Sequence, residues 1–313
     1  MTQLTTPPAG PPAPESAPAR EPAETPVRTK RLRHPREKAG PLGRALRITA
    51  LTATSVIFIY PFLWLVSASL KPSEDVFDNA LIPKVVQWEN YADIWGEVPL
   101  LTWVWNSAVV TLAAAVAVTV SSAIVAFGFA YFRFPGRNAL FALVISTMML
   151  PAVVLMIPQY LVWNELHLAS SQIPLWAPNL FGSAFYIFLL RQFFLGLPRE
   201  LFEAARIDGA SYWGMFWRIA VPLCRPALVV TFIFEVHASW TDLVRPLVYL
   251  RDPELYTVPR GLKAVLDQFG EGGEMRWEIV AAASVIVTVP MIIAFFLCQK
   301  HFTEGIATQG RKG

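Results

Sequence analysis

Charged side chains are scarce in this sequence of 313 residues. Asp, Glu, Lys and Arg together make up 16% of it, whereas 54% of the residues are hydrophobic. Soluble domains carry roughly 25% charged residues. The low charge content argues against an ordinary soluble domain, and the mean hydropathy of +0.44 points the same way. The composition therefore predicts a membrane protein with several spans.

Motifs for nucleotide binding and for common hydrolytic or redox chemistry are also absent. The sequence has no G-x-x-x-x-G-K-[ST] phosphate-binding loop, no HExxH, no CxxC and no GxSxG. The histidines are scattered, and the cysteines share no metal-like or redox spacing: His34, His167, His237, His301, Cys224 and Cys298. We therefore expect no enzyme, no bound metal and no cofactor. Energy for uphill transport would have to come from another protein.

Six apolar segments are present, each near the roughly 20 residues that a helix needs to cross a bilayer. They cover about residues 48–70, 104–130, 139–163, 173–190, 226–250 and 279–299. Their length and their lack of polar–apolar alternation exclude membrane-spanning strands. The sequence predicts an all-α polytopic membrane protein with six transmembrane helices in a domain covering residues 45–313.

The N-terminal segment differs in composition from the rest. Residues 1 to about 27 are rich in Pro, Ala, Thr and Glu and have almost no large apolar side chains, which predicts disorder. A basic run follows, directly before the first apolar segment. Such a run is more typical of a topology signal or a contact with anionic lipid than of a nucleic-acid-binding arm. We expect residues 1–44 to form a disordered, then basic, cytoplasmic arm.

Loop charges predict the orientation. If the basic N-terminus is inside, the predominantly acidic loop 71–103 is outside, and the turn with Arg133 and Arg137 is inside. The basic segment 191–225 and the basic C-terminal tail are then inside too. Every short loop satisfies the positive-inside rule, so both termini are expected to be cytoplasmic.

The most distinctive stretch lies in that cytoplasmic segment, where residues 203–226 read EAARIDGASYWGMFWRIAVPLCRP. Its first residues favour a helix, and Gly209 can then form a turn because glycine adopts positive φ without steric cost. Apolar residues at helical spacing follow, and Pro222 disturbs the backbone before the next apolar segment. The pattern indicates two short helices on the soluble side of the membrane.

This stretch resembles the EAA loop of ABC importer permeases. Six spaced positions match: Glu203, Ala204, Ala205, Gly209, Ile219 and Pro222. Asp208 and Ala210 fit the carbohydrate branch, the relatives of the second maltose-transporter permease, whereas Val221 replaces the Leu that the family prefers. Segments 60–72, 106–112, 130–137, 148–162, 239–262 and 304–313 are also similar to the family, so the resemblance covers about residues 45–313.

The resemblance implies a type I importer permease in a bacterial cell membrane, with a cytoplasmic coupling helix around residues 203–210. It implies four kinds of partner: a second permease subunit forming a heterodimer, two ATPase subunits, an external solute-binding protein and the lipid bilayer. The solute would be a sugar or oligosaccharide. In such a permease Glu203 would contact an ATPase electrostatically, and Gly209 would set the turn.

The fifth apolar segment carries ionisable residues, which inside a membrane are candidates for function. Asp242 follows Trp240 at the spacing of the family's Trp-Asn-Asp/Glu element, with Thr241 in place of Asn. A polar, aromatic-lined solute pathway through Glu235, Trp240 and Asp242 is one interpretation, and interhelical packing is the other. A proton-coupled secondary carrier using Glu235, His237 and Asp242 is the alternative function. Several tryptophans near predicted interfaces, including Trp103, are mostly explained by an aromatic belt.

Overall fold

The computed structural model describes residues 41–309, and in the last helix it gives no side chains for 294, 295 and 297–309. The chain divides into two compact units, Met1–Thr54 and Ser55–Gly313. The N-terminal segment expected to be disordered lies outside the described residues, as does the end of the C-terminal tail. The first helix begins at Pro41, inside the arm expected over residues 1–44.

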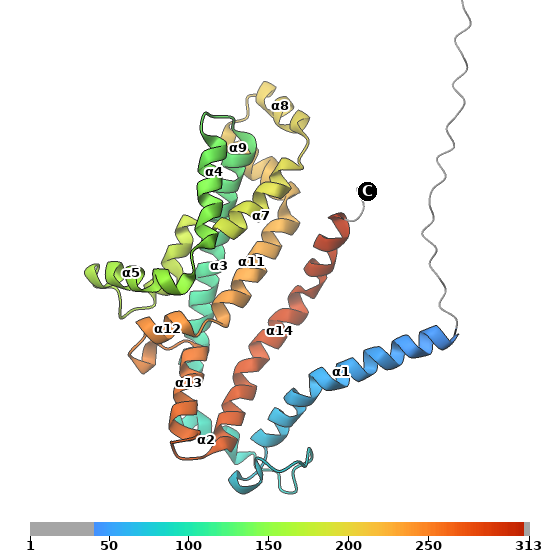
Figure 1. Ribbon diagram of the computed structural model, residues 1–313, viewed down its shortest axis with the longest axis vertical. Helices are drawn as coiled ribbons and strands as arrows, with labels where there is room; N and C mark the ends of the chain where they lie inside the picture. The colour runs from blue at the N-terminus through green and yellow to red at the C-terminus, as the bar shows by residue number, and fades with distance from the viewer. Residues whose placement is uncertain (1–40, 310–313) are drawn as a thin grey trace, which may run out of the picture. The chain divides into compact units, whose positions relative to one another are not determined.

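The described residues form helices and no strands (Figure 1). The longer helices are α1 (Pro41–Ser69), α2 (Glu89–Glu97), α3 (Leu100–Tyr131), α4 (Arg137–Ser146), α5 (Ala152–Glu165), α7 (Ala184–Leu195), α8 (Arg199–Ile207), α11 (Arg225–Trp240), α13 (Val258–Phe269) and α14 (Trp277–Gln309). Short helices are α6 (Ile173–Trp176), α9 (Tyr212–Met215), α10 (Val221–Leu223) and α12 (Val244–Tyr249). The remaining turns are 3₁₀-helical at η1 (Ser73–Asp75), η2 (Thr147–Met149), η3 (Ala177–Phe181) and η5 (Pro253–Leu255), and π-helical at η4 (Phe216–Ala220).

Three helical stretches are long and apolar enough to cross a membrane: Pro41–Ser69, Leu100–Tyr131 and Ile173–Leu195. Two bent pairs raise this number to five among the residues searched, and Trp277–Ile293 is a shorter apolar helix. The all-helical membrane fold is confirmed. The count of six spans stays a prediction.

Two of the expected spans are not single straight helices. The segment 139–163 bends by 99° between Arg137–Met149 and Ala152–Glu165. Pro151 explains the bend, because proline cannot donate a backbone hydrogen bond and pushes the preceding Leu150 into an extended conformation (ψ 122°). The segment 226–250 is also interrupted, since α11 ends at Trp240 and α12 starts only at Val244.

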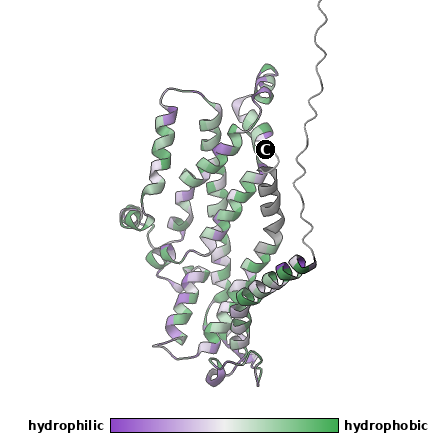
Figure 2. Cartoon of the chain, turned by 45° about the vertical axis from the view of Figure 1, so that its right-hand side comes forward, coloured by the Kyte–Doolittle hydropathy of each residue, from purple (hydrophilic) through white to green (hydrophobic). Residues whose placement is uncertain are grey.

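The second unit is organised around α3, which packs against α7, α11, α13 and η3. Small buried residues on α3, such as Ala114, Ala115 and Ala126, allow neighbouring helices to approach closely. At 1.5 Å per residue, its 32 residues span about 48 Å, more than the roughly 30 Å hydrocarbon core. Figure 2 shows hydrophobic residues predominating along these helices and hydrophilic residues gathering at helix ends and loops.

Two buried clusters occupy the two ends of α3. We call the end near Tyr131, which packs with α7, α8 and η4, the elbow end, and the end near Leu100, which packs with α12, α13 and α14, the far end. Figure 1 shows α8 at the elbow end and α2 and α13 at the far end. Helix α3 is long enough for its two ends to reach opposite surfaces of a membrane.

Candidate functional site

The EAA-like stretch folds as α8, a tight turn and a second short helix at the elbow end. Pro198 precedes α8 in an extended conformation (ψ 128°), so α8 begins only at the next residue, Arg199. The helix ends at Ile207, and Gly209 adopts φ +79°, a region that L-residues with a side chain rarely enter. Ser211 then caps α9, its hydroxyl accepting a hydrogen bond from the Gly214 backbone N–H at 3.1 Å.

A π-helical turn, η4, links α9 to α10 and places large apolar groups in the core. Met215 and Phe216 are fully buried there, and Ile219 is half-buried against the same cluster. Pro222 is exposed. The chain then bends by 79° between Tyr212–Leu223 and Arg225–Trp240, so the elbow turns sharply into the next membrane helix.

Aromatic packing holds α8 and η4 against α3. Phe127 lies at its centre, with ring centroids 5.2 Å from Tyr131, 6.1 Å from Phe202 on α8 and 5.3 Å from Phe216 on η4. The T-shaped pair of Phe127 and Phe194 at 5.9 Å adds α7. Such pairs contribute about 0.5–1.5 kcal/mol beyond area burial. One side chain of α3 thus connects three other elements of the elbow.

The opposite face of α8 is uncovered. Glu203, Ala204, Asp208 and Gly209 are exposed, whereas Ala205 is half-buried. Ile207, at the end of α8, is 87% exposed. The sequence did not identify it as a functional residue, because it is not one of the positions that match the EAA pattern. An apolar side chain this exposed beside charged residues is suited to contact with another protein.

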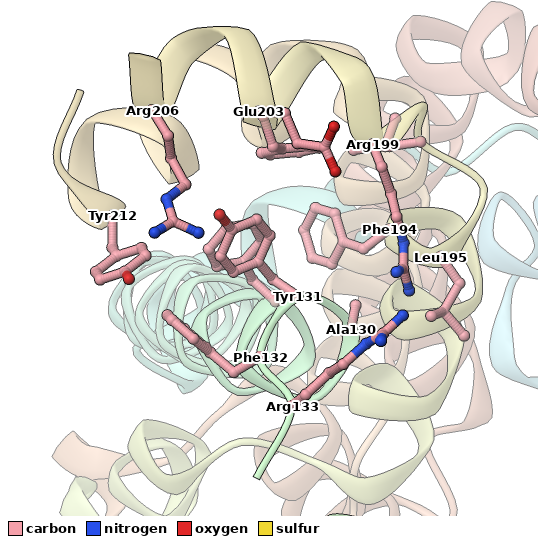
Figure 3. A pocket seen from close by; sticks show the side chains of 13 residues that line it. Ala130, Tyr131, Phe132, Arg133, Phe194, Leu195, Arg199, Glu203, Arg206 and Tyr212 are labelled. Carbon is pink, nitrogen blue, oxygen red and sulfur yellow. The ribbon is translucent and has the colours of Figure 1, made fainter. Parts of the chain in front are cut away.

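A pocket of about 330 Å³ lies beneath α8, between that helix and the ends of α3 and α7 (Figure 3). Arg133, Arg199 and Arg206 line it together with Glu203. Figure 3 shows the guanidinium groups of Arg133 and Arg199 next to each other, and that of Arg206 beside Tyr131. Within the described part of the chain, none of these three arginines forms a side-chain ion pair or hydrogen bond.

The membrane carboxylates have structural partners. Glu235 is 8% exposed, and Asn179 on η3 donates a hydrogen bond to its Oε1 at 2.6 Å. Asp242 pairs with Arg245 and accepts from the Val244 backbone N–H at 3.1 Å, so it also supports the start of α12. His237 is exposed, and no hydrogen bond or ion pair between described residues joins it to Glu235 or Asp242.

A second pocket, of about 380 Å³, lies where α5 faces the break between α11 and α12. Asp242 lines it, as do Gln159, Arg245 and Tyr249, whereas Glu235 and Trp240 do not. Trp240 is half-buried against the far-end cluster instead. Sequence reasoning did not single out Gln159, because a lone glutamine in an apolar segment has no motif to identify it.

Residues 119–307 match the family described as the binding-protein-dependent transport system inner membrane component. The chain belongs to this family. The permease is 34% identical over 264 residues to the arabinooligosaccharides transport system permease protein AraQ of Bacillus subtilis (strain 168), covering 83% of this chain and 92% of the relative. It is also 34% identical over 260 residues to the sn-glycerol-3-phosphate transport system permease protein UgpE of Yersinia pestis bv. Antiqua (strain Antiqua), covering 80% and 91%.

A solved structure supports the same fold. The permease matches a chain of a bacterial ABC transporter involved in the import of the acidic polysaccharide alginate, with a TM-score of 0.74 and 23% identity over 83% of this chain and 96% of that one. The importer-permease prediction is therefore confirmed: the chain is an inner-membrane transport subunit, which is not itself an enzyme. The proton-coupled carrier through Glu235, His237 and Asp242 is not supported, because the family transports with a binding protein.

Proposed function

We propose that α8 is the coupling helix through which a separate ATPase subunit moves the membrane helices. The observation that carries this proposal is the two-sided character of α8. Phe202 is buried against the aromatic cluster of α3, while Ala204 and Ile207 are exposed, and Glu203 is exposed although it also lines the pocket beneath α8. A helix anchored on one face and uncovered on the other can transmit a push from a partner to the bundle.

The turn after α8 fits this role. Gly209 reverses the chain with positive φ, so the uncovered end of α8 projects instead of continuing along the bundle. Asp208 and Glu203 supply negative charge beside Ile207, which combines an apolar anchor with charges that select a basic partner surface. At the other end of the elbow, Ile219 packs against the buried cluster, and Pro222 lies in α10 shortly before the next membrane helix begins at Arg225.

The elbow end faces the cytoplasm in this proposal, and both termini lie on that side. Arginines are concentrated there, at Arg133, Arg137, Arg199, Arg206 and Arg218, as the positive-inside rule requires. The working importer then contains a second permease subunit, two ATPase subunits and an external solute-binding protein that meets the far end.

We further propose that the solute is a neutral oligosaccharide, which contacts the pocket at the helix break. Asp242 and Arg245 pair with each other, so they present dipoles and hydrogen-bonding groups without net charge. Gln159 has no hydrogen-bond partner among the described side chains, which leaves its amide available to a hydroxyl group. The arabinooligosaccharide relatives support this choice of solute.

The coupling role is tested with Ile207→Asp in the complete importer. We expect the ATPase to co-purify with the permeases at least about tenfold less, because burying a carboxylate in an apolar contact costs several kcal/mol. Ile82→Asp is the matched control. Ile82 is 83% exposed, close to the 87% of Ile207, but it lies in the loop between α1 and α2. Equal ATPase retention in the two variants would overturn the assignment.

The solute proposal has a separate test. Gln159→Leu keeps the size of the side chain and removes its amide, so uptake of a neutral arabino-oligosaccharide should fall severalfold while ATPase association stays unchanged. Leu161→Ala, an exposed change on the same helix that removes no polar group, is the control. Normal uptake by Gln159→Leu would exclude this residue from the pathway.

A further inference from the structure

The arginine-lined pocket beneath α8 is not accounted for by coupling to an ATPase. Its arginines line a pocket between α8 and the ends of α3 and α7, whereas Ile207 is exposed and is not part of the lining. Three guanidinium groups against the single carboxylate of Glu203 leave positive charge in excess. Neighbouring unpaired cations repel each other, and an anion between them would receive charge-assisted hydrogen bonds from rigid, forked donors.

The floor of this pocket is apolar and aromatic. Phe127, Tyr131, Phe132, Phe194 and Phe202 line it together with the arginines. A small hydrated anion gains nothing from such a floor. A ligand that carries both an anionic group and a hydrocarbon chain would contact the arginines with the first and the aromatic residues with the second.

A second pocket, of about 340 Å³, lies next to the first. The two share Phe127, Phe132 and Tyr212, and the second extends along α3 past Gly128 to Ile124. It has no charged residue in its lining. Ile124 lies seven residues before Tyr131, the last residue of α3, so this pocket extends as a groove about 10 Å along α3 from the elbow toward the middle of the helix.

Gly128 keeps this groove open. A Cβ atom built at Gly128 meets nothing within 4 Å, so the space beside the helix is free at this position. Glycine in a helix interior costs roughly 0.5–1 kcal/mol relative to alanine, and here it opens a path for a chain-like ligand.

We propose that these two pockets together bind an anionic phospholipid. Its phosphate lies at Arg133 and Arg199, with Arg206 adding positive charge from across the same pocket, and one acyl chain follows the groove past Gly128 toward Ile124. Basic pockets between transmembrane helices are sites where anionic head groups bind. A free phosphate or an acidic protein side chain satisfies the arginines but leaves the groove empty, so the groove favours the lipid. The lipid then ties α8 to α3 and α7.

The test measures thermal unfolding of the complete importer in detergent without nucleotide, so its outcome is independent of the coupling role. Phosphatidylglycerol, phosphatidylcholine and inorganic phosphate are titrated separately. We expect phosphatidylglycerol to raise the melting temperature most, because a ligand that binds only the folded state stabilises it. Equal effects of the two lipids on the unaltered importer would overturn the proposal.

Two variants distinguish the contribution of the lipid head group to binding from that of the acyl chain. Replacing Arg133, Arg199 and Arg206 together by Gln should weaken phosphatidylglycerol binding at least about tenfold and abolish its preference over phosphatidylcholine. Gly128→Leu should weaken phosphatidylglycerol binding by filling the groove, with no change in the response to inorganic phosphate. Arg218→Gln with Arg225→Gln is the control, because both arginines are exposed on the same elbow but line neither pocket.

The remaining outcomes identify other occupants. If inorganic phosphate reproduces the full effect and Gly128→Leu changes nothing, the site binds a small anion and the lipid proposal is wrong. The proposal also fails if the triple Gln variant loses the ATPase but keeps its phosphatidylglycerol preference, since an acidic partner segment then occupies the arginines. A loss of preference in the Arg218 and Arg225 control would indicate general surface charge instead.

Discussion

The two ends of α3 are stabilised in different ways. At the far end, polar side chains hold the loop after α12: Trp103 donates to the Pro253 carbonyl at 2.8 Å, and Asn106 donates to the Glu254 carbonyl at 2.8 Å. The Val258 backbone N–H donates to the Ser107 hydroxyl at 2.7 Å. At the elbow end, aromatic rings do most of the packing, and three arginines have no partner in the described structure.

The far end is thus a locked region held by hydrogen bonds, whereas the elbow end has charged side chains without partners in the described structure. Hydrogen bonds are directional and fix the far-end loop in one position. Aromatic and apolar contacts are less directional, and the elbow leaves both charge and Ile207 uncovered. The far-end loop is therefore held in place by hydrogen bonds within the chain, whereas the elbow end leaves the charged and apolar groups that the coupling and lipid proposals use.

The largest expected effect is at the centre of the elbow. Phe127→Ala should lower the free energy of unfolding by about 3–5 kcal/mol, because it removes a buried ring that contacts α7, α8 and η4. Thermal unfolding in detergent measures the change. Phe134→Ala is the matched control, since Phe134 is 39% exposed at the same end of α3, and it should cost under about 1 kcal/mol. Similar losses in both variants would mean that the ring cluster does not organise the elbow.

A smaller effect is expected in the locked region. A Cβ atom at Gly261 on α13 would lie 2.1 Å from Cε3 of the buried Trp103, so Gly261→Ala should destabilise the protein by about 1–3 kcal/mol through overpacking. Gly128→Ala, where a Cβ meets nothing within 4 Å, should be neutral or slightly stabilising. Melting temperatures of the pair compare the two ends directly. A harmless Gly261→Ala would show that the far end is looser than its hydrogen bonds indicate.

The smallest effect concerns pH at the far end. Lys71 is 1% exposed and pairs with Asp78, and this hydrogen bond lowers the pKa of the Asp78 carboxyl below its usual value. Stability from the pair is complete above the unfolded pKa of about 3.9 and is lost as pH falls through the lower folded pKa. Melting curves from pH 6 down to about pH 3 should therefore fall less steeply for Asp78→Asn than for the unaltered protein.

Asp75→Asn is the control for this comparison, because Asp75 lies on the same loop and forms no ion pair in the described structure. Its melting curve should keep the slope of the unaltered protein. An unchanged slope in Asp78→Asn would mean that the buried lysine does not depend on this carboxylate.

Composition and motif spacing were enough to predict the class of protein, because the hydrophobic length of a span and the EAA spacing are both properties of contiguous residues. The aromatic belt expected to explain most of the tryptophans near predicted interfaces does not account for Trp103, which is 2% exposed in the far-end cluster. The segment 139–163 was expected to be one span and has a 99° bend at Pro151, so its crossing of the membrane as a single span stays a prediction. A proline in a membrane helix can be tolerated or can end it, and only the packing around it decides.

The candidate sites show the same division. Sequence alone identified the stretch from Glu203 to Pro222, because its residues are neighbours along the chain. The tertiary structure decided which side of α8 is anchored, since Phe202 meets Phe127 only when α8 folds back on α3. It also brought Arg133 beside Arg199 and exposed Ile207. Spacing along one chain segment determined the family, whereas contacts between distant segments determined which side chains are buried and which remain uncovered, because residues far apart in the sequence meet only in the folded chain.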